Sequence, residues 1–169
     1  MTAHKPGAPT TLNRLYGRSK GKPLRAGQQG PVDNPLPKIS MPEDGPITAE
    51  GLFGDDRPLH FEIGFGGGEH MAARADMLPG HGFIGAEPFI NGVANLLSLI
   101  ERDGLTNVRI FDDDARKLFP FLPDAGIGKV YTLFSDPWPK KRHHRRRFIG
   151  TETLDALARF LMDGAEFRF

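Results

Sequence analysis

Short apolar runs recur along the chain from residue 58 onward, and glycines, acids or prolines end most of them. Runs of four to eight such residues are typical of buried β-strands. We expect strands at residues 59–63, 82–86, 108–111 and 129–134, and a fifth at residues 165–169.

Between these runs, apolar residues recur every three or four positions, which is the spacing of one face of an α-helix. This spacing predicts helices over residues 90–100 and 154–161, a weaker helix over 71–78, and at most a turn or two at 115–119. Alternating strands and helices indicate an α/β fold with a doubly wound, mostly parallel sheet. In such sheets, ligands bind at the carboxyl ends of the strands.

Residues 1–56 have a different pattern. They contain eight prolines and many glycines, and no period of 2 or 3.6 residues is sustained. Such a composition favours an extended segment over a packed core. We therefore expect a basic, partly disordered N-terminal arm over residues 1–56 and a folded domain over residues 57–169.

Charge is distributed unevenly, although the formal net charge is only +1. Residues 1–32 carry six basic and no acidic side chains, and residues 140–147 carry six more basic ones. The rest of the chain has ten basic against 21 acidic residues. Two basic segments on an acidic body are typical of a protein that binds a polyanion, although a charged segment is often only solvated surface.

Several classes of protein are excluded or disfavoured by what the sequence lacks. It has no apolar stretch of about 18 residues, no secretory signal pattern and no cysteine. We therefore expect a cytoplasmic protein with no membrane partner. The lack of cysteine also excludes disulfides, thiolate metal sites and a cysteine nucleophile.

A glycine-rich turn follows the first predicted strand. Glu62 precedes glycines at alternate positions, Gly64, Gly66 and Gly68, and Glu69 then opens a helix. A dinucleotide fingerprint would place its third glycine at position 69, so this spacing suits a cationic amino-acid moiety better than a diphosphate. The turn alone is weak evidence, because such glycines can also serve only strand–helix packing.

Acids also follow the next two predicted strands. Glu87 lies 23 residues after Gly64, where nucleotide-binding sheets bind a ribose diol. Asp114 ends a run of three aspartates after the third strand and can reach an adenine amino group; alternatively, it caps the next short helix. Acids after three successive parallel strands together favour a nucleoside site.

The most specific segment follows the fourth strand and reads Asp-Pro-Trp-Pro-Lys-Lys-Arg-His-His-Arg-Arg-Arg from Asp136 to Arg147. This segment and the Glu-Ile-Gly-Phe-Gly-Gly-Gly-Glu turn resemble the bacterial tRNA (guanine-N7-)-methyltransferases over roughly residues 58–169. The resemblance implies a Rossmann-like class I methyltransferase fold. It also implies S-adenosylmethionine as cofactor, S-adenosylhomocysteine as product, and methylation of tRNA at guanine N7.

By the same resemblance, Glu62, Glu87, Asp114 and Asp136 match the acids that contact the cofactor. Asp136 also matches the proposed catalytic residue, and Lys140 matches a lysine that contacts the substrate.

Physical reasoning agrees with these roles. Guanine N7 has a free lone pair at neutral pH, so catalysis needs alignment rather than a general base. Asp136 can bind the guanine N1 and N2 donors or oppose the charge that develops on the ring.

The remaining residues of the segment suggest RNA contacts. Trp138 can stack on an extruded base, or else pack beneath its own loop. Lys140, Arg145, Arg146 and Arg147 can hold phosphates. His143 and His144 lie among arginines with no complementary carboxylate spacing, so we expect no metal.

Two alternative functions remain open. Asp136-Pro137-Trp138 partly matches the Asp-Pro-Pro-aromatic motif of the exocyclic-amine methyltransferases of nucleic acids, but lacks the second proline. A non-catalytic RNA-binding module on a similar sheet is the other alternative. The family continues beyond the point that matches Phe169, so we expect a chain truncated at its C-terminus. We favour a monomer.

Overall fold

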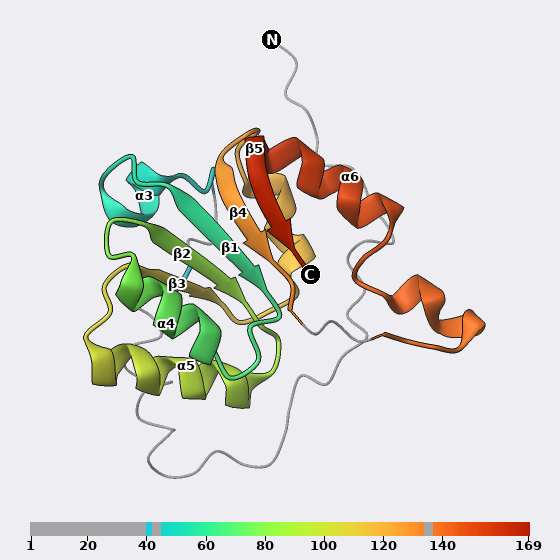
Figure 1. Ribbon diagram of the computed structural model, residues 1–169, viewed down its shortest axis with the longest axis horizontal. Helices are drawn as coiled ribbons and strands as arrows, with labels where there is room; N and C mark the ends of the chain where they lie inside the picture. The colour runs from blue at the N-terminus through green and yellow to red at the C-terminus, as the bar shows by residue number, and fades with distance from the viewer. Residues whose placement is uncertain (1–39, 42–44, 134–136) are drawn as a thin grey trace.

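The computed structural model describes residues 40, 41, 45–133 and 137–169. Its centre is a sheet of five parallel strands in the order β3-β2-β1-β4-β5. The strands are β1 (Leu59–Ile63), β2 (Gly82–Ala86), β3 (Val108–Phe111), β4 (Ile127–Tyr131) and β5 (Leu161–Arg168). The sheet confirms the predicted doubly wound α/β fold, and the chain reverses its direction of winding between β1 and β4 (Figure 1).

Two helices cover one face of the sheet. They are α4 (Glu69–Met77) and α5 (Ile90–Asp103), which lie side by side at the lower left of Figure 1, along the β2–β3 part of the sheet. Met71 of α4, Phe83 of β2 and Leu96 of α5 belong to one buried cluster. This packing uses the apolar face that the helical spacing predicts.

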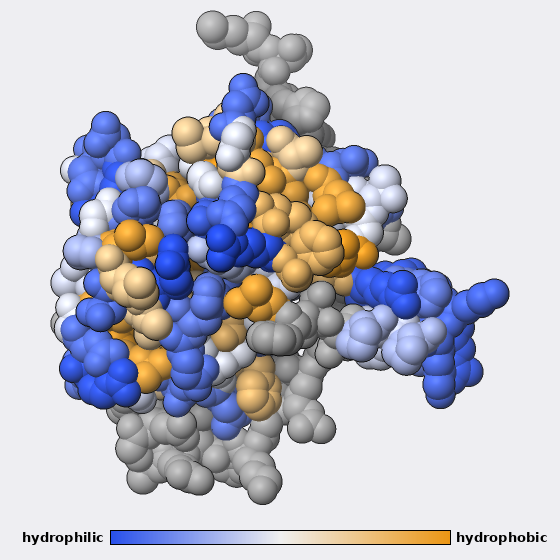
Figure 2. Space-filling model, in the orientation of Figure 1, coloured by the Kyte–Doolittle hydropathy of each residue, from blue (hydrophilic) through white to orange (hydrophobic). Residues whose placement is uncertain are grey.

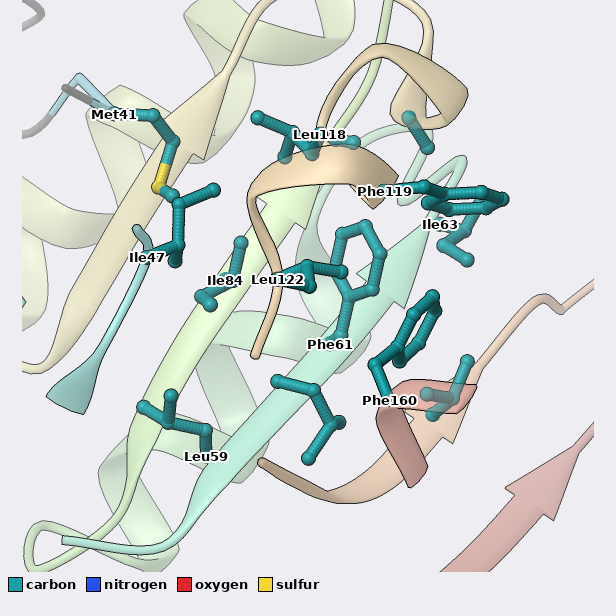
Figure 3. Packing of buried hydrophobic residues seen from close by; sticks show 14 of the residues in the cluster. Met41, Ile47, Leu59, Phe61, Ile63, Ile84, Leu118, Phe119, Leu122 and Phe160 are labelled. Atoms are coloured by element: carbon teal, nitrogen blue, oxygen red, sulfur yellow. The ribbon is translucent and has the colours of Figure 1, made fainter. Parts of the chain in front are cut away.

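The opposite face packs against α6 (Thr151–Phe160) and two short 3₁₀ helices, η2 (Ala115–Lys117) and η3 (Phe119–Phe121). Phe61 and Ile63 of β1 point into this cluster, where Phe61 lies beside Phe160 (Figure 3). Successive residues of a strand point to opposite faces, so His60 and Glu62 of β1 point toward α4 instead. Glu62 therefore lies on the face of the sheet that α4 and α5 cover, near the carboxyl edge.

The described part of residues 40–56 is packed on the domain. Ser40 forms an isolated parallel bridge with Ile110, and the short helix α3 (Ala49–Phe53) begins at the N-cap Thr48. Ile47 and Leu52 are buried in the core. The sequence pattern predicted no element here, because a five-residue helix is too short to show a period. The division of the chain at residue 57 stays a prediction.

Several element boundaries differ from the predicted ones. Strand β4 begins at Ile127 rather than at residue 129, and it ends at Tyr131. Leu161, expected on the last helix, begins β5, so that strand starts four residues earlier than predicted. No loop separates α6 from β5, and the helical apolar spacing therefore runs into the strand without a signal.

Candidate functional site

Three acids lie at the carboxyl edge of the sheet. Ile63, Ala86 and Phe111 are register partners, so β1, β2 and β3 end at the same level. Glu62, Glu87 and Asp114 are 5%, 8% and 4% exposed. Buried carboxylates are rare because removing a charge from water is costly, so three at one sheet edge mark this edge as the candidate site.

Glu62 is held by a histidine that the sequence analysis did not single out. Nδ1 of His70, in the first turn of α4, lies 2.8 Å from Oε2 of Glu62. Burial raises the pKa of the Glu62 carboxyl, and the hydrogen bond from His70 opposes that rise. Nothing in the sequence pattern distinguishes His70 from a surface residue, because the contact joins two elements.

Glu87 joins the two loops that begin the neighbouring helices. Its Oε2 accepts a hydrogen bond from the Gly66 amide at 2.8 Å, and its Oε1 accepts one from the Phe89 amide at 2.9 Å. Burial raises the pKa of the Glu87 carboxyl, while the two amides act in the opposite direction. A single carboxylate thus fixes the glycine-rich turn relative to the start of α5.

The glycine-rich turn needs its glycines for conformational reasons. Gly64, Gly66 and Gly68 have φ values of +69°, +57° and +80°, a region that L-residues with side chains rarely adopt. Gly68 is also the N-cap of α4. The turn therefore leaves β1 and enters α4 with its backbone bare, which permits close approach by a ligand.

Helix α5 clamps the same turn from the other side. A Cβ atom on Gly92 would lie 2.1 Å from the Gly66 carbonyl oxygen. Nδ2 of Asn95 donates a hydrogen bond of 2.6 Å to the Gly67 carbonyl. Neither residue is expected from the sequence pattern to take part in the site, although a glycine inside a helical pattern is a signal of close packing.

Asp114 is engaged by a neighbouring arginine. Its Oδ1 accepts hydrogen bonds from the Arg116 amide and Nε, and its Oδ2 accepts one of 2.6 Å from Arg116 Nη2. The carboxylate therefore caps η2, which is the alternative that the sequence analysis left open. Oδ2 keeps one lone pair for a further donor.

The segment after β4 is described from Pro137 onward, so Asp136 lies outside the described residues. Trp138 has a φ of +38°, which is uncommon for a bulky residue. Its ring centroid is 5.5 Å from that of His143 and 5.0 Å from the Arg146 guanidinium carbon. Nε of Arg147 donates a hydrogen bond of 2.8 Å to the Pro137 carbonyl, so the chain itself holds Trp138 in place.

The basic residues form a projection from the domain. They lie on the 3₁₀ helix η4 (Lys141–Arg146) and its flanks Lys140 and Arg147, and none of the residues of η4 is buried. In Figure 1 this helix stands away from the sheet, and in Figure 2 it is a hydrophilic protrusion. We call residues 140–147 the basic projection.

In the described ranges, no group of three or more His, Cys, Asp or Glu residues is arranged to hold a metal ion. No helix among the described residues combines the length and the apolarity that crossing a bilayer requires.

Comparison with known proteins gives the family. Residues 56–169 match a family model described as "Putative methyltransferase". The tRNA (guanine-N(7)-)-methyltransferase of Sphingopyxis alaskensis is 64% identical, over all of this chain and 73% of the relative. This chain belongs to the tRNA (guanine-N7-)-methyltransferase family. The proteins of the same name from Novosphingobium aromaticivorans and Erythrobacter litoralis are 60% and 59% identical, over the whole chain and 73% and 72% of the relatives.

Among solved structures, an S-adenosylmethionine-dependent methyltransferase from Thiobacillus denitrificans, in complex with S-adenosyl-L-homocysteine, has a TM-score of 0.48 and 16% identity. The match covers 66% of this chain and 40% of that one.

Proposed function

We propose that this chain transfers a methyl group from S-adenosylmethionine to N7 of a guanine in tRNA. One observation supports the proposal most strongly: this chain, over its whole length, is 64% identical to a relative named for this activity. The buried acids at the ends of β1, β2 and β3 support it independently, because they suit a nucleoside with a cationic group.

Glu87 fits the ribose of such a ligand. Each of its carboxylate oxygens accepts one backbone amide, and each has a second lone pair. A ribose diol offers two hydroxyl donors on adjacent carbons, which match the two oxygens of one carboxylate. The amide hydrogen bonds hold these oxygens before any ligand arrives, so we assign the diol to Glu87.

Glu62 and the glycine-rich turn fit the methionine part. The Glu62 carboxylate is anionic when ionised and suits the ammonium group, and the bare backbone of Gly64, Gly66 and Gly68 lets the ligand approach closely. Asp114 is proposed to accept the adenine amino group through the free lone pair on Oδ2. When bound, S-adenosylmethionine supplies an electrophilic methyl group on a sulfonium.

The residues proposed to contact the substrate follow β4, which lies on the opposite side of β1 from β2 and β3. We propose that Asp136 also contacts the cofactor, and that it aligns the guanine and opposes the positive charge that its ring gains as N7 forms a bond. The N7 lone pair is free at neutral pH, so no side chain has to remove a proton. We propose that RNA phosphates contact Lys140, Arg145, Arg146 and Arg147. Trp138 is proposed to stack on an RNA base.

Nucleoside analysis of methylated tRNA tests the proposal. Unmodified tRNA is incubated with the chain and methyl-labelled S-adenosylmethionine, then digested and separated. Label in 7-methylguanosine is the expected result. Label in an exocyclic-amine product assigns the chain to the alternative chemistry, and absence of label together with tRNA binding assigns it to a binding module.

A further inference from the structure

His70 connects three elements at the acidic edge of the sheet. It is the second residue of α4, and its Nδ1 lies 2.8 Å from Oε2 of Glu62 on β1. Its ring packs edge to face on Tyr131 of β4, with ring centroids 4.8 Å apart and an interplanar angle of 67°. Glu62 and Tyr131 are register partners across β1 and β4, so His70 spans both strands from above.

We propose that His70 is the positioning residue for Glu62, whose carboxylate it holds ready for the ligand at the carboxyl edge of the sheet. This inference rests on the proposed function, since it assumes that Glu62 binds the methyl donor. His70 acts through Glu62 and need not touch the ligand itself.

The geometry gives His70 this task for two reasons. Glutamate has three side-chain torsions, so a carboxylate without an anchor loses freedom when a ligand binds, and the affinity falls accordingly. A carboxylate has about four acceptor positions, and His70 occupies one of them. The others stay available while the orientation of the group is fixed in advance.

The direction of the hydrogen bond follows from the chemistry of the pair. An ionised carboxylate only accepts, so Nδ1 of His70 carries the proton when Glu62 is ionised. The T-shaped contact with Tyr131 keeps the ring in the plane that this bond requires. Tyr131 is 2% exposed and therefore is a rigid support.

Two substitutions distinguish the roles of the two ring nitrogens of His70. In His70→Asn the amide nitrogen takes the place of Nδ1, whereas in His70→Gln it takes the place of Nε2. Asp76→Asn, on an exposed position of the same helix, is the control. Calorimetric titration with S-adenosylhomocysteine gives the dissociation constant of each folded variant, with thermal unfolding as the check on folding.

We expect His70→Asn and Asp76→Asn to bind within about threefold of the wild type. His70→Gln should weaken binding by up to roughly tenfold, the ratio that corresponds to ordering one unanchored side chain on binding. A purely structural role would alter the unfolding temperature without this Asn–Gln difference. Equal affinities for all variants, or equal losses for Asn and Gln, would overturn the inference.

The free protein provides a second readout. Nitrogen-15 spectra of the imidazole rings should show the neutral His70 with its proton on Nδ1, and a proton on Nε2 would overturn the inference without any ligand. A wild-type chain that gives no heat with S-adenosylhomocysteine contradicts the proposed function, and the positioning of Glu62 for it as well. A wild type that binds while the variants bind equally contradicts the positioning alone.

Discussion

Gly92 shows how narrowly single residues determine the shape of the site. Its Cα faces the Gly66 carbonyl so closely that a methyl group would lie 2.1 Å from that oxygen. The oxygen belongs to the backbone and cannot rotate away as a side chain does. Either α5 or the glycine-rich turn must move to admit any larger residue.

We therefore predict that Gly92→Ala destabilises the fold by about 1–3 kcal/mol, the usual cost of overpacking, although alanine favours helices. Chemical denaturation measures this difference. Gly80→Ala is the matched control, since a Cβ there meets nothing within 4 Å. Stabilisation by Gly92→Ala would show that the turn is not clamped by α5.

Asp136 is the residue whose carboxylate is proposed to align the guanine and to oppose its developing charge. Asp136→Asn keeps the shape but removes the charge and replaces an acceptor with a donor. We predict a fall in turnover of roughly 10²-fold, comparable to the loss of one preorganised electrostatic contact. Turnover is measured with S-adenosylmethionine saturating and with Asp155→Asn, at an exposed position of α6, as control. Near-normal 7-methylguanosine formation would remove Asp136 from the chemistry.

His60 makes the stability of the domain depend on pH. Its Nε2 lies 3.0 Å from His81 Nδ1, and burial, together with the charges of His81, Lys129 and Arg74, lowers its pKa from 6.5 to about 4. Between these values the unfolded chain binds a proton that the folded chain does not. The contribution of His60 is therefore complete above about pH 6.5 and is lost as the pH falls toward 4.

The substitution His60→Phe tests this prediction, because it keeps a ring between Phe83 and Tyr131 and removes the titration. Between pH 7 and 4.5 the wild type should lose about 2 kcal/mol more unfolding free energy than the variant. Parallel curves for the two proteins would mean that His60 has the same pKa in the folded and the unfolded chain.

At the scale of elements, the basic projection divides into supporting and exposed cations. Arg147 donates to the Pro137 and Trp138 carbonyls, and Arg146 packs on the Trp138 ring. Arg145 and Lys141 are exposed on η4. Arg146 and Arg147 thus shape the loop in addition to offering positive charge, whereas Lys141 and Arg145 offer their charge from the surface of η4.

This division gives different expectations for two double variants in tRNA binding. Lys141→Ala with Arg145→Ala should reduce the slope of log affinity against log salt by roughly 1 per lost phosphate contact. Arg146→Ala with Arg147→Ala should reduce the slope and also alter the near-ultraviolet spectrum of Trp138. Filter binding over a range of salt concentrations measures the slopes. Unchanged slopes in both variants would assign the projection to structure alone.

Elements with a strong local pattern could be predicted from the sequence. The apolar runs of β1 and β2 and the helical spacing of α5 were placed correctly, because each buries a continuous face. The end of α6 was placed one residue too late and the start of β5 four residues too late, since Leu161 continues a helical spacing into a strand. Helix α3 was missed because it is short and depends on contacts with the core.

The site was predictable only in part, for a related reason. Acids at or just beyond the ends of strands can be found by their position in the sequence, as Glu62, Glu87 and Asp114 were. Their partners cannot, because the contacts of Glu62 with His70 and of Gly67 with Asn95 join residues that only the fold brings together. The Arg116 pairing of Asp114 likewise depends on the turn into η2.

At the scale of the whole molecule, the strand order places the acidic edge and the basic projection on the same side of the sheet. Strand β1 lies between β2 and β4, so the glycine-rich turn and the segment after β4 both leave the carboxyl edge where the winding reverses. A cationic methyl donor and an anionic RNA can thus meet there, each beside side chains of opposite charge.

Methyl transfer by the proposed route requires that the carboxyl ends of β1, β2 and β3 bind the methyl donor. Calorimetric titration of S-adenosylhomocysteine into the wild type and Glu87→Ala tests this requirement directly and needs no RNA. We predict one site in the wild type and binding weaker by about 1.5–3 kcal/mol in the variant, the range for hydrogen bonds to charged groups. Equal affinity in the two proteins, or no heat in the wild type, would contradict the placement of the donor at this edge.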